Sequence, residues 1–212
     1  MDSEARIGEA AAQFFEMLFT DLKPISPLSL LESIPKLVSR EDNEMLEALP
    51  RKEEVRRVMF DMDGESTPGP DRYTSRFFKF AWQIISEDVF KVVLSFFCGA
   101  ELPKAITATS IMLIPKVDQP HDFLQFHPIN LCNFFNKIFS RVLADRLAAV
   151  LPKIISPQQS GSVYGRLILD NFLLVQELMA GIGKRANSGN IALKLNMSIV
   201  YNCMSWLFFT IV

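Results

Sequence analysis

The sequence predicts an α+β fold, and three observations lead to it. Apolar residues recur at helical spacing over residues 3–20, 73–97 and 131–151. Two extended segments, residues 106–117 and 123–131, are separated by a turn-like DQPH and predict a β-hairpin. Helices before a hairpin, followed by further helices and a last short strand, are typical of α+β proteins rather than of a βαβ repeat.

The composition is that of a folded protein rather than a disordered chain, a collagen or a disulfide scaffold. The chain has 212 residues, of which 49% are hydrophobic and 22% charged, with 18 Phe and a formal net charge of -2. Its three cysteines, Cys98, Cys132 and Cys203, form no CxxC pair, and His121 and His127 have no ligand-spaced partners. We therefore expect no metal site of the zinc type and a reducing compartment.

The N-terminal third is expected to be helical, with a break. Residues 3–20 place apolar side chains on one helical face, and prolines interrupt residues 21–38. Ser39 and Asp42 have the spacing of a capping box and predict the start of a short helix. Residues 55–62 form the next apolar stripe, and these stripes are interpreted as packing faces.

The middle of the chain begins with a rigid turn at residues 64–71, which contain two prolines and two glycines. A Phe-rich helix over residues 73–97 follows, and Gly99 ends it. After the hairpin, residues 131–151 predict a long amphipathic helix that Pro152 stops.

The C-terminal part predicts a helix from about residue 167 to 179 and a strand over residues 191–195. No charged residue follows Lys194, so an uncharged stretch of 18 residues closes the sequence. Its length approaches a membrane span, but several Asn, Ser and Thr dilute it. A buried strand followed by an interrupted helix is the expected origin, and a membrane partner is not expected. The first ten residues carry no apolar signal-peptide core, which predicts an intracellular protein of the cytoplasm or nucleus, not a secreted one.

Charge is unevenly distributed along the chain. Residues 103–194 hold ten Lys/Arg against five Asp/Glu, a net charge of +5, whereas residues 1–102 hold twelve against nineteen, a net charge of -7. A basic segment of this kind fits RNA or DNA as a partner, although a solvated face of mixed lysines has the same composition.

Four short motifs occur in order. Residues 66–71 read STPGPD, LIPK at 113–116 is followed by FHPINL at 126–131, residues 159–166 read QSGSVYGR, and residues 193–202 read LKLNMSIVYN. Their order and spacing resemble the reverse transcriptase of LINE-type, non-LTR retrotransposons, most closely the plant versions. The resemblance covers nearly the whole chain.

The resemblance implies a partial right-hand polymerase, with fingers and the beginning of the palm, preceded by a mostly helical connector. It divides the chain into a connector at residues 1–62 and a truncated reverse transcriptase domain at residues 63–212. It also implies RNA-directed DNA synthesis as the family activity.

The resemblance places nucleotide-binding positions on the hairpin and on the loop that follows the long helix. Lys116 occupies the family's lysine position, where a cation holds the triphosphate. His127 replaces the family's arginine and cannot make a bidentate fork. Arg166 resembles a further position near template or nucleotide. The alternative is structural: Lys116 as a solvated hairpin cation and Arg166 as a partner of a loop carbonyl.

The last motif carries the family's catalytic Asp and a steric gate against the ribose 2′-hydroxyl. Asn196 occupies the catalytic Asp position, Tyr201 the gate, and Asn202 the position of a second Asp. In the intact family that Asp binds two Mg²⁺ ions, whose charge an amide cannot neutralise. The paired aspartates of a later family motif occur nowhere in these 212 residues. We therefore expect no Mg²⁺ cofactor, no small-molecule substrate and no polymerase activity for this chain.

Three hypotheses follow from the sequence. The first is a diverged, inactive remnant of a LINE-type reverse transcriptase. The second is a non-catalytic module that binds RNA or DNA through residues 103–194. The third is an interaction or membrane-tethered fragment that uses the apolar residues 195–212.

Overall fold

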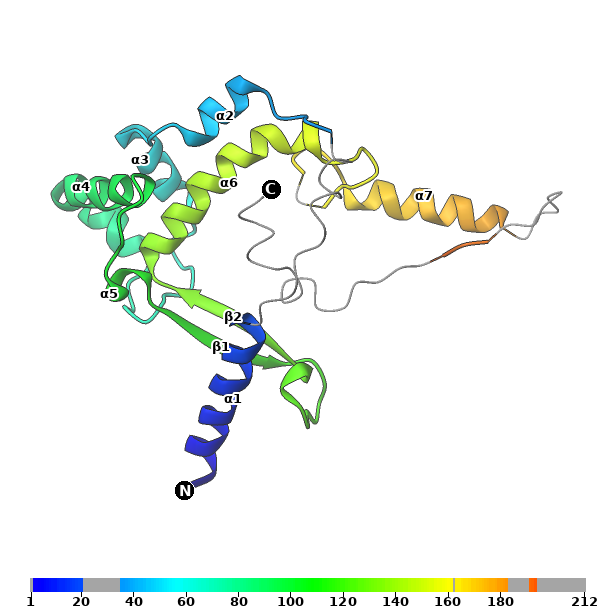
Figure 1. Cartoon of the computed structure of the whole chain (residues 1–212), viewed down its shortest axis with the longest axis horizontal. Coiled ribbons are helices and arrows are strands. Elements are labelled where there is room, and N and C mark those ends of the chain that lie inside the picture. The colour runs from blue at the N-terminus through cyan, green and yellow to red at the C-terminus, as the bar shows by residue number, and fades with distance from the viewer. Residues whose placement is uncertain (1, 21–34, 162, 183–190, 194–212) are drawn as a thin grey trace. The chain divides into compact units, whose positions relative to one another are not determined.

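The described part of the chain comprises residues 2–20, 35–161, 163–182 and 191–193 of a computed structural model. These residues are mostly helical and include one two-stranded antiparallel sheet, which is an α+β arrangement (Figure 1). The chain divides into two compact units: residues 38–165, and residues 1–37 together with 166–212. Whether this arrangement is a partial polymerase stays a prediction.

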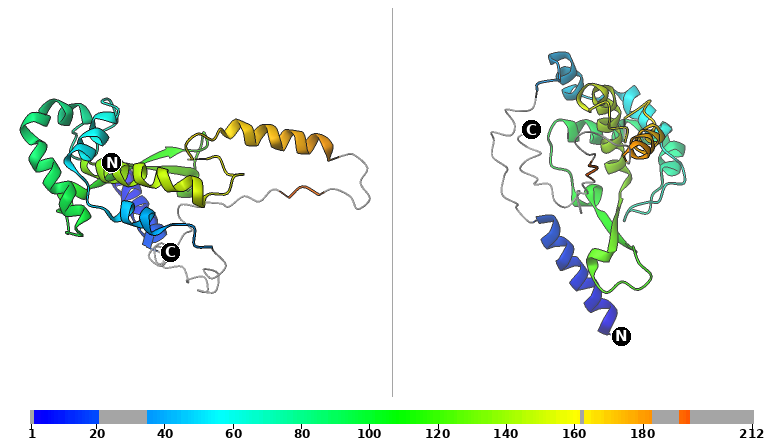
Figure 2. Two further views of the ribbon diagram at one scale, coloured as in Figure 1. Left: turned by 90° about the horizontal axis from the view of Figure 1, so that it is seen from above. Right: turned by 90° about the vertical axis from the view of Figure 1, so that its right-hand side faces the viewer.

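The first unit is a helical cluster around one long helix. Its helices are α2 (Arg40–Glu47), α3 (Lys52–Asp61), α4 (Ser75–Phe97), the single-turn α5 (Lys104–Thr107) and α6 (Phe134–Ile154). The other four helices all contact α6. Both views of Figure 2 show α3 and α4 beside α6. The helix that the sequence predicts over residues 131–151 is thus the central element of this unit.

A β-hairpin extends from the N-terminal end of α6 (Figure 1). Strands β1 (Thr109–Pro115) and β2 (Phe126–Cys132) pair antiparallel along their whole length, with Thr109 opposite Cys132 and Pro115 opposite Phe126. A short 3-10 helix, η2 (Phe123–Gln125), leads into β2. The predicted hairpin is therefore confirmed, with its turn where the sequence places it.

The hydrophobic core of this unit joins α3, α4 and α6. Two stacked aromatic pairs connect α4 with α6: the rings of Phe78 and Phe134 are 4.1 Å apart, and those of Phe96 and Phe139 are 4.2 Å apart. Burial of this apolar surface is the main stabilising term of the unit. The buried members of the cluster are Val55, Val58, Met59, Phe78, Val89, Val93, Phe134, Ile138, Phe139 and Val142. The core includes residues on both sides of position 62, and the predicted domain boundary there stays a prediction.

The sequence predicts the start of α2 correctly and the end of α6 incorrectly. The capping box is confirmed: the Asp42 N–H donates to Ser39 Oγ and the Ser39 N–H donates to the Asp42 carboxylate, each at 3.1 Å. The prediction that Pro152 stops the long helix is wrong, because α6 continues to Ile154. A proline so close to a helix end removes one backbone donor, and the Ile155 N–H still reaches the Leu151 carbonyl at 2.9 Å.

The second unit contains α1 (Asp2–Thr20) and α7 (Ile168–Gly181). Both helices lie where the periodicity of the sequence predicts them. No residue of α7 is buried, and its surface is rich in exposed Leu, Ile and Phe. Residues 191–193 are not part of a strand, and the remainder of the predicted strand and the apolar stretch at 195–212 lie outside the described residues.

Candidate functional site

The hairpin brings two of the predicted nucleotide-binding residues onto one face. His127 lies directly opposite Ile114, and the Lys116 N–H continues the ladder by donating to the Gln125 carbonyl at 2.8 Å. Side chains alternate between the two faces of a strand, so Lys116, Ile114 and His127 share a face. Both predicted residues are exposed. The register therefore places Lys116 and His127 on one face, and their role in nucleotide binding stays a prediction.

The Lys116 ammonium is held by the hairpin itself. It donates to the Leu124 carbonyl at 2.9 Å, and no carboxylate forms an ion pair with it among the described residues. A neutral carbonyl positions the ammonium without cancelling its charge. The positive charge stays available to an anionic ligand, while the same contact fits the structural alternative of a solvated hairpin cation.

The same hairpin face exposes apolar side chains. Met112 lies opposite Ile129, and both are exposed together with Ile114. A two-stranded hairpin has no second layer of its own to cover such residues. This face therefore combines two polar side chains, Lys116 and His127, with an uncovered apolar surface.

The turn at residues 66–71 is fastened to the base of this hairpin. Gly69 lies so close to the junction of β2 and α6 that an added Cβ would be 2.4 Å from a backbone carbon of Cys132. The Asp71 N–H donates to Asn133 Oδ1 at 3.0 Å, and Asn133 Nδ2 donates to the Ala105 carbonyl at 2.7 Å. The buried Asn133 thus links the turn, α5 and the start of α6. Only glycine fits this approach.

A second contact holds the same turn from one helical turn further along α6. The Lys137 ammonium donates to the Thr67 carbonyl and approaches Ser66 Oγ at 3.4 Å. The STPGPD motif is consequently an architectural element. It fixes where α6 begins and therefore how the hairpin leaves the helical cluster.

The remaining predicted site residues are not in the described part of the unit that contains the hairpin. Arg166 is half-buried and follows Gly165, whose φ of 78° is in the region that favours glycine. It belongs with α7 to the second unit, whereas Lys116 and His127 belong to the first. Asn196 and Tyr201 lie outside the described residues.

The first unit contains a buried ion pair that was not predicted from the sequence. Arg146, 7% exposed on α6, makes a bidentate contact with Glu54 of α3 through Nε at 3.0 Å and Nη2 at 2.9 Å. Its Nη1 donates to the carbonyls of Leu46 and Ala48, which ties the end of α2 to the same group. The hydrogen bonds from Arg146 hold the pKa of Glu54 below its ordinary value. The spacing in the sequence could have predicted that Arg146 is buried, because it lies four residues from both Val142 and Val150 on the buried face of α6.

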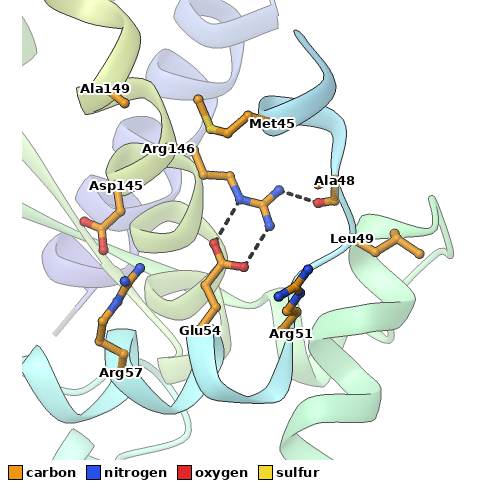
Figure 3. Close-up of a pocket in the computed structure, with 9 residues that line it drawn as sticks. All are labelled: Met45, Ala48, Leu49, Arg51, Glu54, Arg57, Asp145, Arg146 and Ala149. Carbon is orange, nitrogen blue, oxygen red and sulfur yellow. Dashed lines mark hydrogen bonds and ion pairs between the residues drawn. The ribbon is translucent and has the colours of Figure 1, made fainter. Parts of the chain in front are cut away.

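A pocket of about 330 Å³ opens beside this pair (Figure 3). Glu54 and Arg57 of α3 and Arg51, which directly precedes this helix, line the pocket. Met45, Ala48, Leu49 and Ala149 supply its apolar lining. The guanidinium of Arg146 already contacts Glu54 and two backbone carbonyls. It therefore does not offer the pocket an unpaired positive charge for a ligand. The residues that line it come from three helices and their connections, and they do not form a recognisable catalytic arrangement.

Neither a metal centre nor a spanning helix occurs in the described ranges. No group of three His, Cys, Asp or Glu side chains there could hold a metal ion. No helix among these residues has both the length and the apolar character needed to cross a bilayer.

Comparison with known proteins supplies an independent observation. No protein-family model matches the chain. Over 181 residues, however, the chain is 32% identical to the uncharacterized 149 kDa protein of transposon TX1 from Xenopus laevis. The chain is related to a transposon-encoded protein. The match covers 84% of this chain and 14% of that much longer protein.

Proposed function

We propose that the chain is a piece of the reverse transcriptase of a LINE-type, non-LTR retrotransposon, comprising the fingers and the beginning of the palm. The similarity to a transposon-encoded protein over 181 residues carries this proposal, because so long a match cannot rest on one short motif. The four ordered motifs supply the finer assignment. The plant-type resemblance rests on the motifs alone, since the relative comes from a frog.

The geometry of the first unit supports this assignment. The STPGPD turn, the hairpin with Lys116 and the start of α6 are joined through Asn133 and Gly69. Three segments that the resemblance treats as one domain thus contact one another. A chance likeness of short motifs would not require their residues to meet in space.

The donor set of the last motif does not fit the two-metal centre of the family. Asn196 and Asn202 offer neutral amide oxygens where bridging of two divalent cations needs anionic ones. Removing the charge that neutralises the reacting phosphates costs about two orders of magnitude in rate or more. We therefore propose that this polypeptide does not synthesise DNA.

A primer-extension assay tests this proposal. The 212-residue chain is incubated with a primed RNA template, dNTPs and either Mg²⁺ or Mn²⁺, and an active LINE-type reverse transcriptase is the positive control. We expect no template-dependent incorporation, and none from Asn196→Asp either, because these 212 residues contain no pair of adjacent aspartates. Incorporation by the unmodified chain would refute the proposal of inactivity.

A second function, binding of RNA or DNA without catalysis, is favoured by the hairpin. Lys116 is exposed, held in place and not neutralised by a carboxylate among the described residues, in a segment of net charge +5. Sequence-independent binding through such cations weakens steeply with salt.

Filter binding across a salt series measures this function directly. Lys116→Ala should lower the slope of log K against log salt by about 0.9 if this ammonium contacts a phosphate. Lys91→Ala, at an exposed lysine of α4 outside the basic segment, is the matched control and should leave the slope unchanged. Absence of binding at low salt would remove this second function.

A further inference from the structure

The outer side of the first half of α4 carries an uncovered apolar stripe. Phe80 and Ile84 are 91% and 86% exposed, although they lie one helical turn apart on the same helix as the buried Phe78. Phe77 continues the stripe toward the start of α4, and the ring of Tyr73 lies 4.7 Å from it. In the first unit, Phe80 and Ile84 are left uncovered, whereas Tyr73 and Phe77 are half-exposed and contact the ring of Phe78.

The stripe is larger than scattered surface apolar residues would be. The three aromatic side chains have about 150–250 Å² each to bury, and together with Ile84 the exposed portions present on the order of 500 Å². That is near the upper end of the largest apolar patch on an ordinary monomer. The spacing of Phe77, Phe80 and Ile84 is that of one face of a helix packing against another helix.

Positive charges lie near the first end of the stripe, and negative charges follow its other end. From residue 72 to residue 86 the chain has three cations, Arg72, Arg76 and Lys79, and no carboxylate, and then come Glu87 and Asp88. The contacts of Arg76 with Glu65 and of Glu87 with Lys52 are exposed ion pairs, which contribute little and can be exchanged. The basic end of the stripe is therefore complementary to its own acidic end in an antiparallel arrangement.

We propose that this stripe is a self-association surface on which a second copy of the chain packs its α4 antiparallel to the first. Phe80 of each copy then lies against Ile84 of the partner subunit, and Arg76 lies beside Glu87 of the partner subunit. A parallel arrangement would instead place like charges together. The two-fold pairing uses the same patch twice, as closed homodimers do.

The expected dimer is weak. Two patches of on the order of 500 Å² bury about 1,000 Å² in total, which is at the lower end of specific interfaces. We therefore expect a dissociation constant on the order of 10 µM rather than a permanent dimer.

Sedimentation velocity of the full chain between about 1 and about 100 µM tests the proposal. The unmodified chain should convert from monomer to dimer over this range. Phe80→Glu and Ile84→Glu should each raise the dissociation constant at least about tenfold, because each places a charge in the centre of the interface. Ile168→Glu is the matched control, since this exposed residue lies on the apolar helix α7 of the second unit.

Charge reversal gives a second, independent readout. Arg76→Glu should weaken association, and Arg76→Glu combined with Glu87→Arg should restore it, because the pair is rebuilt across the interface with its signs exchanged. Circular dichroism confirms that each variant is folded, as expected for changes at exposed positions.

Four outcomes would overturn the proposal. They are a chain that stays monomeric throughout, association that Phe80→Glu leaves intact, association that Ile168→Glu abolishes, and a failure of the double reversal to rescue Arg76→Glu. If Phe80→Glu instead removes binding of single-stranded RNA and leaves association unchanged, the stripe contacts nucleic acid and not a second copy.

Discussion

Arg146→Met tests how the first unit holds α2, α3 and α6 together. The substitution keeps an unbranched apolar stem but removes the guanidinium that contacts Glu54 and the carbonyls of Leu46 and Ala48. It therefore leaves a carboxylate and two carbonyl groups without their donor. Arg146→Lys keeps the positive charge but loses the bidentate contact with the Glu54 carboxylate.

The structure sets the size of the expected effect. Removing one partner of a buried ion pair costs about 3–5 kcal/mol of unfolding free energy. The Glu54 side chain is 21% exposed and can regain some water, so Arg146→Met should cost about 3 kcal/mol, near the lower limit. Arg146→Lys should cost about 1–2 kcal/mol, because a single ammonium cannot satisfy the carboxylate and the carbonyls together.

Urea unfolding of the full chain and its variants, followed by circular dichroism, gives these differences. The double variant Glu54→Met with Arg146→Met should be more stable than Arg146→Met alone, since it leaves no buried charge unpaired. A cost below about 1 kcal/mol for Arg146→Met, or a double variant at least as unstable as the single one, would refute the reasoning.

The pH dependence of stability follows from the same pair. The folded pKa of Glu54 is lowered by its hydrogen bonds from Arg146, so the pair stabilises the fold above the ordinary Glu pKa of about 4.3. This contribution is lost as the pH falls through the folded pKa. Glu54→Gln should therefore flatten the acid limb of the stability curve, and an unchanged limb would contradict the assignment.

Three further local contacts are tested by substitution, each followed by urea unfolding. Gly69→Ala should cost about 1–3 kcal/mol or more, because its Cβ would lie 2.4 Å from backbone, whereas Gly64→Ala, whose nearest neighbour is 3.9 Å away, should change stability by less than about 1 kcal/mol. Asn133→Asp should destabilise by about 1–3 kcal/mol, since it keeps the acceptor for one contact but loses the amide donor for the other; equal stability would contradict the hydrogen-bond assignment. Lys153→Ala should cost less than about 1 kcal/mol, because the lysine is half-exposed, while Asp42→Ala also breaks the capping box and should cost more.

Much of the secondary structure could be predicted because its signals are local. The hairpin, the capped start of α2 and the long helices follow from residue spacing within one element. The end of α6 could not be predicted in the same way. Pro152 is unfavourable in a helix interior, but its position in the last turn makes its missing donor inexpensive.

Contacts between distant segments were harder to foresee. Arg146 reads in sequence as one more basic residue of a positively charged segment, yet it is buried and committed to Glu54, 92 positions away. Its engagement removes one of the ten cations from any surface available to nucleic acid. Net charge along the sequence therefore overstates the basic surface, and Lys116, which no described carboxylate neutralises, is the better test of binding.

The motifs divide into two kinds once their contacts are known. Gly69 and Asn133 hold the frame, because they determine how the 66–71 turn, the hairpin and α6 meet, and their side-chain requirements are met in this chain. Under the proposed assignment, His127 and Asn196 stand where a LINE-type reverse transcriptase has charged groups for chemistry, and both depart from that pattern. Folding of the first unit depends on the first kind, and under the same assignment DNA synthesis would depend on the second. A chain that keeps the frame residues and loses the charged ones can therefore fold around α6 and retain Lys116 on its hairpin without being a polymerase.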